Sequence, residues 1–450
     1  MKTLSEEFVR RIRATHADAE DFLRAIDTPP ALSVRYNALK IGDMPEHAGR
    51  VAWCREGRYL SERPSFTCDP LLHAGAYYVQ EASSMSIAAV IESVRSLLPE
   101  RPLCLDLCAA PGGKSTLLMS HIDGLVWANE YVRSRAWILC ENVAKWGTGN
   151  AIVSNMSPEQ IGRAGVQCDL MLIDAPCSGE GMFRKDDVAV SEWSAENAQM
   201  CAERQRQILT DVWPALADGG ILIYSTCTYN PEENERNAEW IVETLGATAI
   251  DTNLTRFEGI TAVDFAGGKG FAFYPHKVRG EGFFVCALQK NGSRETTIKS
   301  KVSKAKIVTT KECNDMLRRG YQAMAYEDRI FALQSGYEDC VNDISSRLDL
   351  MQIGTPIAQK MVKRGQTEYI PSAESAMSLC IDKGAYRAVG LTKDDALKFL
   401  HGDTNISLPT DVPTGWIMVC YDGLGLGYVK NVGRRVNNYY PREWRIKMSV

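Results

Sequence analysis

Two cysteines of the chain could supply a nucleophile, because each follows an apolar, strand-like segment. Cys177 ends LMLIDAPC, three residues after Asp174, and Cys227 ends ILIYSTC. In an open α/β sheet, ligands bind beyond the carboxyl ends of the strands, so both thiols and the carboxylate are expected at one ligand-binding edge. Either cysteine alone could instead be a buried core residue. Two thiols at this edge, one of them beside an acid, favour covalent chemistry on a bound substrate.

A glycine-rich loop at 106–116, DLCAAPGGKST, lies between a strand-like segment and a helical pattern. A P-loop is a near miss, since Cys108 stands where that motif requires its first glycine, and the fingerprint G-x-G-x-x-G is absent as well. Gly112 and Gly113 follow Pro111, which predicts a tight turn. Such a turn is costly unless the backbone must approach a ligand closely, so a ligand is favoured over an empty turn.

Polar residues also end the next two expected strands. Glu130 stands where an acidic residue of a doubly wound fold accepts hydrogen bonds from ribose hydroxyls. Asn155 closes the third strand at the same edge, where its amide could meet an adenine. The ligand is therefore expected to contain a ribose and need not carry a pyrophosphate. S-adenosylmethionine meets that description.

A methyl donor beside a thiol and an acid suits methylation of a pyrimidine at C5. That carbon is a poor nucleophile, so an enzyme first adds a thiolate to C6, and an acid at N3 offsets the developing charge. A base then removes the C5 proton and the thiol is expelled. Amino-group methylation would instead favour a DPPY-like strand end, where this chain has DAPC. Spacing alone leaves open which of the two thiols attacks.

The elements that must position these residues alternate between strands and helices from about 76 to 290. Such βαβ alternation predicts a mostly parallel sheet covered on both faces. Strands are expected at 103–107, 125–130, 151–155, 170–176 and 221–227, helices at about 196–217 and from Asn230-Pro231, and a closing hairpin from FAFYPH and GFFVCAL. One helix is expected over SEEFVRRIRATHADAEDFLRAI, an exposed Lys-rich linker after Gln289, and helical signals before strands in the last third.

Length and composition bound the class of protein. At about 150 residues per domain, 450 residues suggest about three domains. With 45% hydrophobic and 24% charged residues, disordered and disulfide-scaffold classes are excluded. No apolar run is long enough to span a bilayer and the N-terminus does not read as a signal peptide, so a cytosolic protein is expected. Fourteen cysteines without a CxxC pair and six histidines support neither a disulfide framework nor a zinc site.

The charge is segregated along the chain. The formal net charge of -5 argues against a nucleic-acid-coating protein when it is taken as an average. Residues 290–319 nevertheless carry a net +6 and residues 421–450 a net +4, which leaves -15 for the rest. The C-terminal run interleaves its cations with Tyr428, Tyr439, Tyr440 and Trp444. It is a candidate RNA surface, because cations bind phosphate and aromatic rings stack unpaired bases, although a solvated face over core aromatics would look the same.

Several motifs now resemble one family, over about residues 76–290. DLCAAPGGK, DAPCSGEG and STCT, with YVQEASS upstream and PHKVRGEGFF downstream, resemble the Nop2/Sun (RsmB/RsmF) RNA cytosine-5 methyltransferases. The resemblance implies a Rossmann-like class I S-adenosylmethionine-dependent methyltransferase core. It also implies that Cys227 attacks the base, that Cys177 assists product release and that Asp174 contacts cytosine N3 near the donor.

The resemblance assigns the cofactor-binding residues as well. They are Cys108, Ala109, Ala110, Pro111, Gly112, Gly113, Lys114, Glu130, Asn155 and Asp174. Asn155 departs from the Asp that is common in close relatives, but an amide can still accept from the adenine edge. Lys114 could orient Asp174, touch the substrate or be a solvated lysine. Phe183, Arg184 and Lys185 could reach a flipped-out nucleotide or its neighbours, since chemistry on a paired base requires extrusion.

The flanks resemble the RsmF branch and set the expected domains. LSVRYNALK looks like an N-terminal RNA-contact module, here a small α+β module over 1–75, ahead of the core at 76–290. A first C-terminal α/β domain is expected over 305–375 and a PUA-like β-barrel over 376–450. The branch implies 16S rRNA or the small ribosomal subunit as partner, with no obligate protein partner, membrane or metal. The rival hypotheses are a tRNA substrate, a non-catalytic RNA-binding assembly factor, and a DNA methyltransferase with Cys177 as nucleophile.

Overall fold

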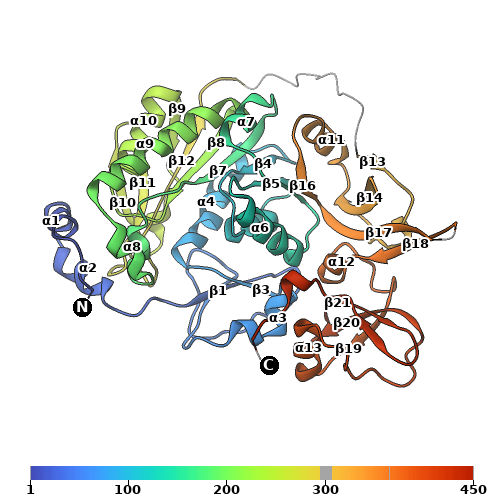
Figure 1. Cartoon of the computed structure of the whole chain (residues 1–450). Coiled ribbons are helices and arrows are strands. Elements are labelled where there is room, and N and C mark those ends of the chain that lie inside the picture. The colour runs from blue at the N-terminus through green and yellow to red at the C-terminus, as the bar shows by residue number, and fades with distance from the viewer. Residues whose placement is uncertain (1, 294–306, 364, 449–450) are drawn as a thin grey trace.

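The structure is a computed structural model that describes residues 2–293, 307–363 and 365–448. Its centre is a ten-stranded sheet in the order β10-β11-β12-β8-β7-β4-β5-β6-β16, with β9 paired to β12 (Figure 1). The parallel strands are β4 (Leu103–Asp106), β5 (Leu125–Asn129), β6 (Ala151–Ser154), β7 (Cys168–Asp174) and β8 (Leu216–Thr226). The antiparallel strands are β9 (Ala247–Ile250), β10 (Thr261–Phe265), β11 (Gly268–Phe273), β12 (Phe283–Lys290) and β16 (Leu350–Ile353).

Helices cover both faces of this sheet, as the βαβ alternation predicts. Successive residues of one strand enter different cores: Leu172 of β7 belongs to one core cluster and Ile173 to the other. The first cluster includes α4 (Ile87–Val94), α5 (Gly113–His121) and α6 (Arg133–Trp146). The second includes α7 (Pro158–Arg163), α9 (Ala195–Val212), α10 (Glu235–Leu245) and α11 (Glu338–Arg347). Side chains buried on both faces explain why the strand segments are nearly continuous apolar runs.

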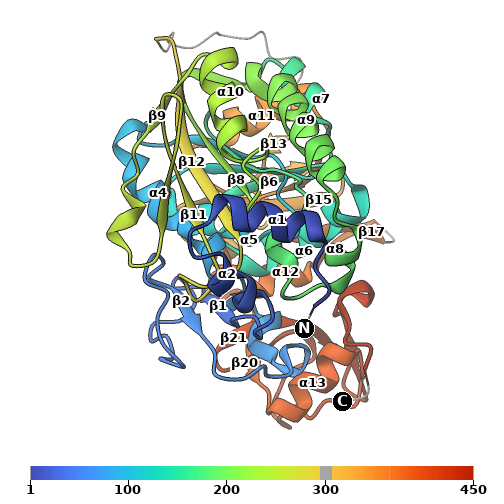
Figure 2. The ribbon, with the colours of Figure 1, turned by 90° about the vertical axis from the view of Figure 1, so that its left-hand side faces the viewer.

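The N-terminal part forms two helices and a small sheet. The single helix expected there is divided into α1 (Glu6–Thr15) and α2 (Ala19–Ile26), because His16 is extended and ends α1. Both helices lie against one side of the core (Figure 2), where Phe8 and Phe22 share a buried cluster with Phe183 and Trp193. The sheet contains β1 (Ser33–Tyr36), β2 (Gly57–Tyr59) and β3 (Tyr77–Val79), and α3 (Pro70–His73) precedes β3.

The C-terminal third contains two further sheets. The first begins with strands, so the expectation of helical signals first is wrong; cross-strand pairing over 308–334 overrides local helix preference. It contains β13 (Val308–Thr309), β14 (Tyr321–Tyr326), β15 (Arg329–Gln334), β17 (Thr355–Lys363) and β18 (Gln366–Pro371). The second contains β19 (Arg387–Gly390), β20 (Gly415–Tyr421), β21 (Leu424–Asn431) and β22 (Val436–Asn438), with α12 (Ala373–Met377) and α13 (Lys393–His401) beside it.

Two helix boundaries in the core differ from expectation. The helix expected over 196–217 ends at Val212, because Pro214 lacks an amide hydrogen and the chain turns into β8 from Leu216. The helix expected from Pro231 begins at Glu235, because Asn230 accepts the Glu232 amide in a local turn. Most of the Lys-rich linker, residues 294–306, lies outside the described residues. Among the helices that the structure describes, none is both long and apolar enough to cross a membrane.

Candidate active site

The two thiols singled out in the sequence meet at the carboxyl edge of the sheet. β7 and β8 are parallel neighbours, with Asp174 opposite Ser225, so the loops that follow them start side by side. The Sγ atoms of Cys177 and Cys227 lie 3.1 Å apart, and both thiols are free and partly exposed. Burial and the contact with Cys227 raise the pKa of Cys177 well above its usual value. Cys177 is therefore a protonated thiol in contact with the Cys227 sulfur.

Asp174 and Lys114 form an ion pair beside these thiols. Lys114 Nζ lies 2.8 Å from one Asp174 oxygen, and the Ser225 hydroxyl donates to the other oxygen over 3.0 Å. Burial disfavours the Lys114 ammonium, but the charges of Asp174 and Cys227 outweigh it and raise the pKa of Lys114. Of the three expectations for Lys114, the geometry favours the one in which it orients Asp174.

The glycine-rich loop makes a tight turn into α5. Gly112 has a φ of +114°, in the left-handed region that favours glycine, and α5 begins at Gly113. A Cβ on Gly113 would lie 3.3 Å from the Tyr78 ring, so the loop packs closely against the N-terminal module. Asp106 is fully buried at the end of β4, where burial raises its pKa to about 7. Its Oδ2 accepts from Ser115 Oγ over 2.6 Å, while its Oδ1 is buried without a partner.

Glu130 and Asn155 lie at the same sheet edge. Glu130 is 4% exposed, and its Oε1 accepts the Val132 amide over 2.8 Å. Asn155 Nδ2 donates to the carbonyls of Glu130 and Tyr131, over 2.6 and 2.7 Å. Asn155 therefore fixes the backbone around Glu130 and keeps its side-chain oxygen available as an acceptor. These donors and acceptors fit an adenosyl ligand, and the unpartnered oxygen of Asp106 lies at the loop that would hold it.

Two buried carboxylates that sequence reasoning did not place support the loops bearing the thiols. Glu180 is 0% exposed and accepts from Arg11 over 2.6 Å and from Trp193 Nε1 over 2.9 Å. Glu233 is also buried and accepts the Ser178 amide over 2.8 Å, and burial raises its pKa to about 7. Glu180 stands inside the SGEG motif, which was a usable signal. Its pairing with Arg11 joins residues 169 positions apart and could not be read from local patterns.

The Gly181 position links Glu180 to the candidate nucleophile. The Gly181 amide donates to the Cys227 carbonyl over 2.9 Å. A Cβ on Gly181 would lie 2.5 Å from the Gly282 carbonyl oxygen and 2.7 Å from the Cys227 carbonyl oxygen. Only glycine allows this close approach of three backbone segments.

The expectation that Phe183 and Arg184 reach a flipped-out nucleotide is wrong. Phe183 is 2% exposed and packs on Phe8, with the ring centroids 5.1 Å apart. The Arg184 guanidinium donates to the Gly280 carbonyl over 3.0 Å and forms an ion pair with the Glu281 carboxylate at 3.4 Å. α1 covers Phe183, and the Gly280–Glu281 segment engages Arg184. Lys185 alone of the three is exposed.

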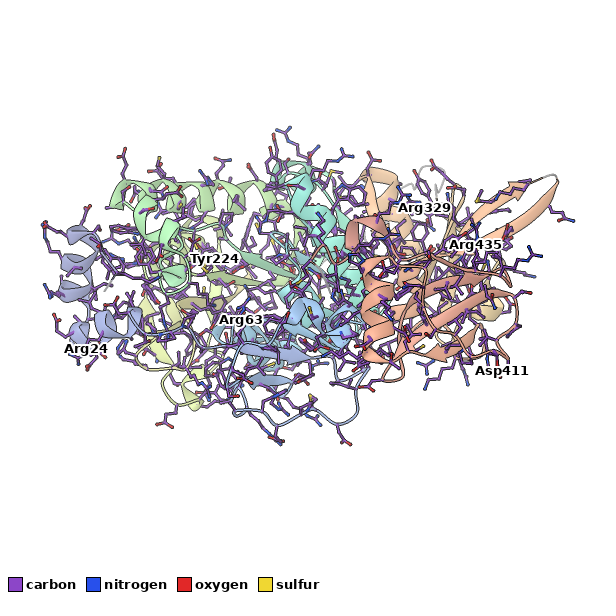
Figure 3. All side chains as sticks on the ribbon, turned by 60° about the horizontal axis from the view of Figure 1, so that its bottom comes forward. Arg24, Arg63, Tyr224, Arg329, Asp411 and Arg435 are labelled. Carbon is purple, nitrogen blue, oxygen red and sulfur yellow. The ribbon has the colours of Figure 1, made fainter. Side chains whose placement is uncertain are left out.

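The C-terminal aromatic run is partly core. Tyr428 and Tyr440 are 0% and 2% exposed, whereas Tyr439 is 40% exposed. Lys430 is paired with Glu368. Arg434 and Arg435 are exposed, and Figure 3 shows Arg435 at the opposite end of the molecule from Arg24 of α2. The available RNA surface here is smaller than the sequence run suggests.

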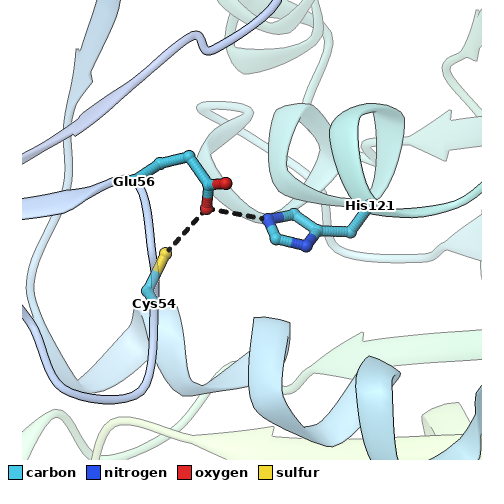
Figure 4. A group of neighbouring side chains, drawn as sticks. All are labelled: Cys54, Glu56 and His121. Atoms are coloured by element: carbon cyan, nitrogen blue, oxygen red, sulfur yellow. Dashed lines mark hydrogen bonds and ion pairs between the residues drawn. The ribbon is translucent and has the colours of Figure 1, made fainter. Parts of the chain in front are cut away.

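One cluster of metal-ligand types occurs among the described residues, away from the thiols. The Glu56 carboxylate lies between Cys54 and His121 (Figure 4), 3.7 Å from the thiol and 3.3 Å from His121 Nε2. Burial opposes ionisation of Glu56, but His121 and Arg35 outweigh it and lower the pKa to about 2. The carboxylate charge is thus balanced by protein groups, and the cluster joins the N-terminal module to the end of α5.

Three family models match the chain. The model of the 16S rRNA methyltransferase RsmB/F matches residues 97–289, the N-terminal domain of 16S rRNA methyltransferase RsmF matches 4–82, and the methyltransferase RsmF PUA domain matches 386–446. The ribosomal RNA small subunit methyltransferase F of Serratia proteamaculans (strain 568) is 30% identical over 472 residues, which cover 97% of this chain and 95% of that protein.

Two solved structures share the core fold. A methyltransferase homolog protein from Pyrococcus horikoshii is 26% identical, with a TM-score of 0.53 over 64% of this chain and 95% of its own. The structure of NSun6 from Pyrococcus horikoshii with SFG has a TM-score of 0.53 and 19% identity over 64% of this chain and 99% of its own. At that identity it supports the fold alone.

The sheet order, the glycine-rich turn and the acid at the end of β5 define a Rossmann-like methyltransferase whose cofactor is S-adenosylmethionine. The chain belongs to the 16S rRNA methyltransferase RsmB/F family, and both of its flanks match RsmF models. The family and fold expected from the motifs are thereby confirmed, and the enzyme is a methyltransferase of ribosomal RNA.

Proposed function

We propose that the protein methylates C5 of a cytosine in 16S rRNA through a covalent bond between Cys227 and C6 of the base. The observation that carries this proposal is the contact of two thiols, 3.1 Å apart, beside the carboxylate of Asp174. Methylation of an exocyclic amine or a ribose hydroxyl needs no thiol, whereas C5 methylation needs a nucleophile at C6. The name of the Serratia relative supports the small-subunit rRNA as substrate.

The chain's own residues provide each protein step. The Cys227 thiolate adds to C6, and the π electron pair of the C5=C6 double bond moves toward C5. Asp174, in its carboxylic acid form, donates its proton in a hydrogen bond to N3 and offsets the negative charge on the ring. Lys114 keeps Asp174 directed into the site through the 2.8 Å contact. S-adenosylmethionine supplies the methyl group that C5 receives. A base then removes the C5 proton, the double bond re-forms and Cys227 leaves, with Cys177 assisting release from its position against the Cys227 sulfur.

Trapping with 5-fluorocytidine tests the role of each thiol. RNA containing this base keeps a fluorine where the C5 proton must leave, so the adduct should accumulate in the wild-type enzyme with donor present. Cys227→Ala should abolish the adduct, and Cys340→Ala, a partly exposed cysteine of α11, serves as a matched control. Adducts that persist in Cys227→Ala but vanish in Cys177→Ala would overturn the assignment and favour the DNA-type arrangement.

Cytosine mapping tests the substrate. Bisulfite sequencing of 16S rRNA and tRNA from a deletion strain should show loss of methylation at a 16S cytosine. Loss confined to tRNA would move the same chemistry to the rival substrate. Unchanged methylation in both RNAs, together with no adduct in vitro, would favour a non-catalytic assembly factor.

A further inference from the structure

A groove with a volume of about 890 Å³ lies between the N-terminal module and the methyltransferase core. One wall comes from the module, over residues 29–33, 60–63 and 79–81, and the other from the core, over 184–185 and 275–279. The volume is at the upper end of the range of about 300–1,000 Å³ for small-molecule pockets, so a nucleotide has room in it.

The walls of the groove are continuous with segments that contact the active-site loops. Its wall at 275–279 continues into Gly282, whose backbone packs on Gly181 and thereby on the Cys227 carbonyl. On the other side, Gln80 lines the groove and lies 3.6 Å from the position of a Cβ on Gly113, in the glycine-rich loop. These contacts connect the two walls of the groove to the glycine-rich loop and to the turn that supports Cys227.

The groove carries three exposed cations, of which Lys185 also acts electrostatically on the Glu281 carboxylate. Arg63, Lys185 and Arg279 are exposed, and none of the ion pairs between described residues includes them. The Arg279 guanidinium lies 4.4 Å from the Tyr59 ring centroid and donates to the Ala48 carbonyl over 3.0 Å, which fixes it at the rim. Arg63, on the loop after β2, is labelled in Figure 3.

The two glutamates on the walls do not cancel this charge. Glu81 is occupied, because its oxygens accept the amides of Ser83 and Ser84 over 2.8 and 2.9 Å. Glu62 is exposed at the rim and opposes phosphate binding there. Arg184 is held by Glu281 and serves as part of the wall. With Arg184 paired to Glu281, the groove holds three further cations against the two carboxylates of Glu62 and Glu81.

We propose that this groove binds the single-stranded RNA next to the target cytosine, with Arg63, Lys185 and Arg279 contacting its phosphates. This proposal rests on the proposed function, with RNA as the substrate, and adds the path of the RNA strand next to the target cytosine. A flipped-out base must leave its neighbours near the mouth of the site, and separated cations along a groove match the spacing of a phosphate backbone. The partly buried C-terminal aromatic run then acts at a distance from the chemistry rather than beside it.

Binding measurements with the full-length enzyme test the proposal. The triple variant R63Q/K185Q/R279Q should weaken binding of a cytosine-containing single-stranded RNA, measured by fluorescence anisotropy, by roughly 10–100-fold at low salt, since each exposed phosphate contact is worth a factor of about 2–5. The slope of log Kd against log salt should fall by about 2, at about 0.7 for each lost phosphate contact. S-adenosylmethionine affinity, measured by calorimetry, should not change.

Two controls keep the outcome interpretable. Lys269→Gln changes an exposed cation at the far end of β11 and should leave RNA affinity and salt slope unchanged. The double variant R63Q/K185Q avoids the structural contacts of Arg279 and should still show about two thirds of the slope change. If RNA affinity is unaltered in both groove variants while the wild-type enzyme still forms 5-methylcytidine, the proposed RNA-binding role of the groove is refuted and the proposed function stands. If the wild-type enzyme forms no 5-methylcytidine, the proposed function is refuted instead.

Discussion

The ion pair between Arg11 and Glu180 attaches α1 to the turn that supports Cys227, and its removal should destabilise the enzyme measurably. Glu180 is 0% exposed and the Arg11 side chain 20% exposed, with 2.6 Å between Nη2 and Oε1. Breaking a buried pair by removing one partner costs about 3–5 kcal/mol. Arg11 is partly solvated, and Glu180 retains Trp193 Nε1 at 2.9 Å, so we expect about 2–3 kcal/mol for Arg11→Ala.

That loss corresponds to a fall in Tm of about 5–10 °C, at about 2–4 °C per kcal/mol for a domain of this size. Differential scanning fluorimetry measures it, and kcat should fall as well, because the Gly181 amide that holds the Cys227 carbonyl follows Glu180. Arg13→Ala is the matched control, since Arg13 pairs with Glu20 at 2.8 Å but both side chains are more than half exposed. Equal Tm values for the two variants would refute the view that the Arg11 pair anchors α1.

Two further predictions follow from contacts at the active site. Hydrogen peroxide is expected to oxidise Cys177 and Cys227, whose sulfur atoms lie 3.1 Å apart, to a disulfide while the peroxide is reduced to water. Mass spectrometry should show the loss of two hydrogens, which dithiothreitol reverses. Persistence of both free thiols would contradict this prediction. Burial raises the pKa of Asp106 from 3.8 to about 7. Between about pH 4 and pH 7 the folded state therefore holds a proton that the unfolded state has released, so the free energy of unfolding falls as the pH rises through this window. The decline in unfolding midpoint from pH 5 to pH 8 should be smaller in Asp106→Asn, and parallel declines would count against the shift.

Much of the core could be predicted because its signals are local. Four of the five parallel strands are short apolar runs, and β4 at Leu103–Asp106 lies within the predicted 103–107. β8 begins at Leu216, ahead of the predicted 221, because the polar Asp218-Gly219-Gly220 stretch signals a turn in the sequence. The juxtaposition of Cys177 and Cys227 follows from one general rule, that adjacent parallel strands end at the same edge of a sheet. Asp174, Lys114 and Glu130 follow from the same rule.

The remaining features depend on contacts between distant segments. Glu233 follows the expected helix start at Asn230-Pro231, yet the helix begins only at Glu235 and the Glu233 carboxylate turns inward to the Ser178 amide. Tyr428 and Tyr440 were grouped with the exposed cations next to them, but both are buried. Tyr428 lies in β21 and packs on Tyr386, and Tyr440 packs on Phe399 of α13. The groove has walls from segments more than 200 positions apart, so no window of sequence contains it.

β16 joins the C-terminal part of the chain to the catalytic sheet. This strand comes from beyond residue 307, yet it pairs with β6, the last parallel strand of the catalytic sheet. A chain cut after Lys290 would leave the backbone groups of β6 without a neighbour on that side. Open strand edges of this kind invite pairing with other chains and aggregation. The C-terminal part therefore covers the edge of the catalytic sheet as well as extending the RNA-binding surface. A truncation or gene fusion made at the linker would remove a strand of the catalytic sheet together with the accessory domain.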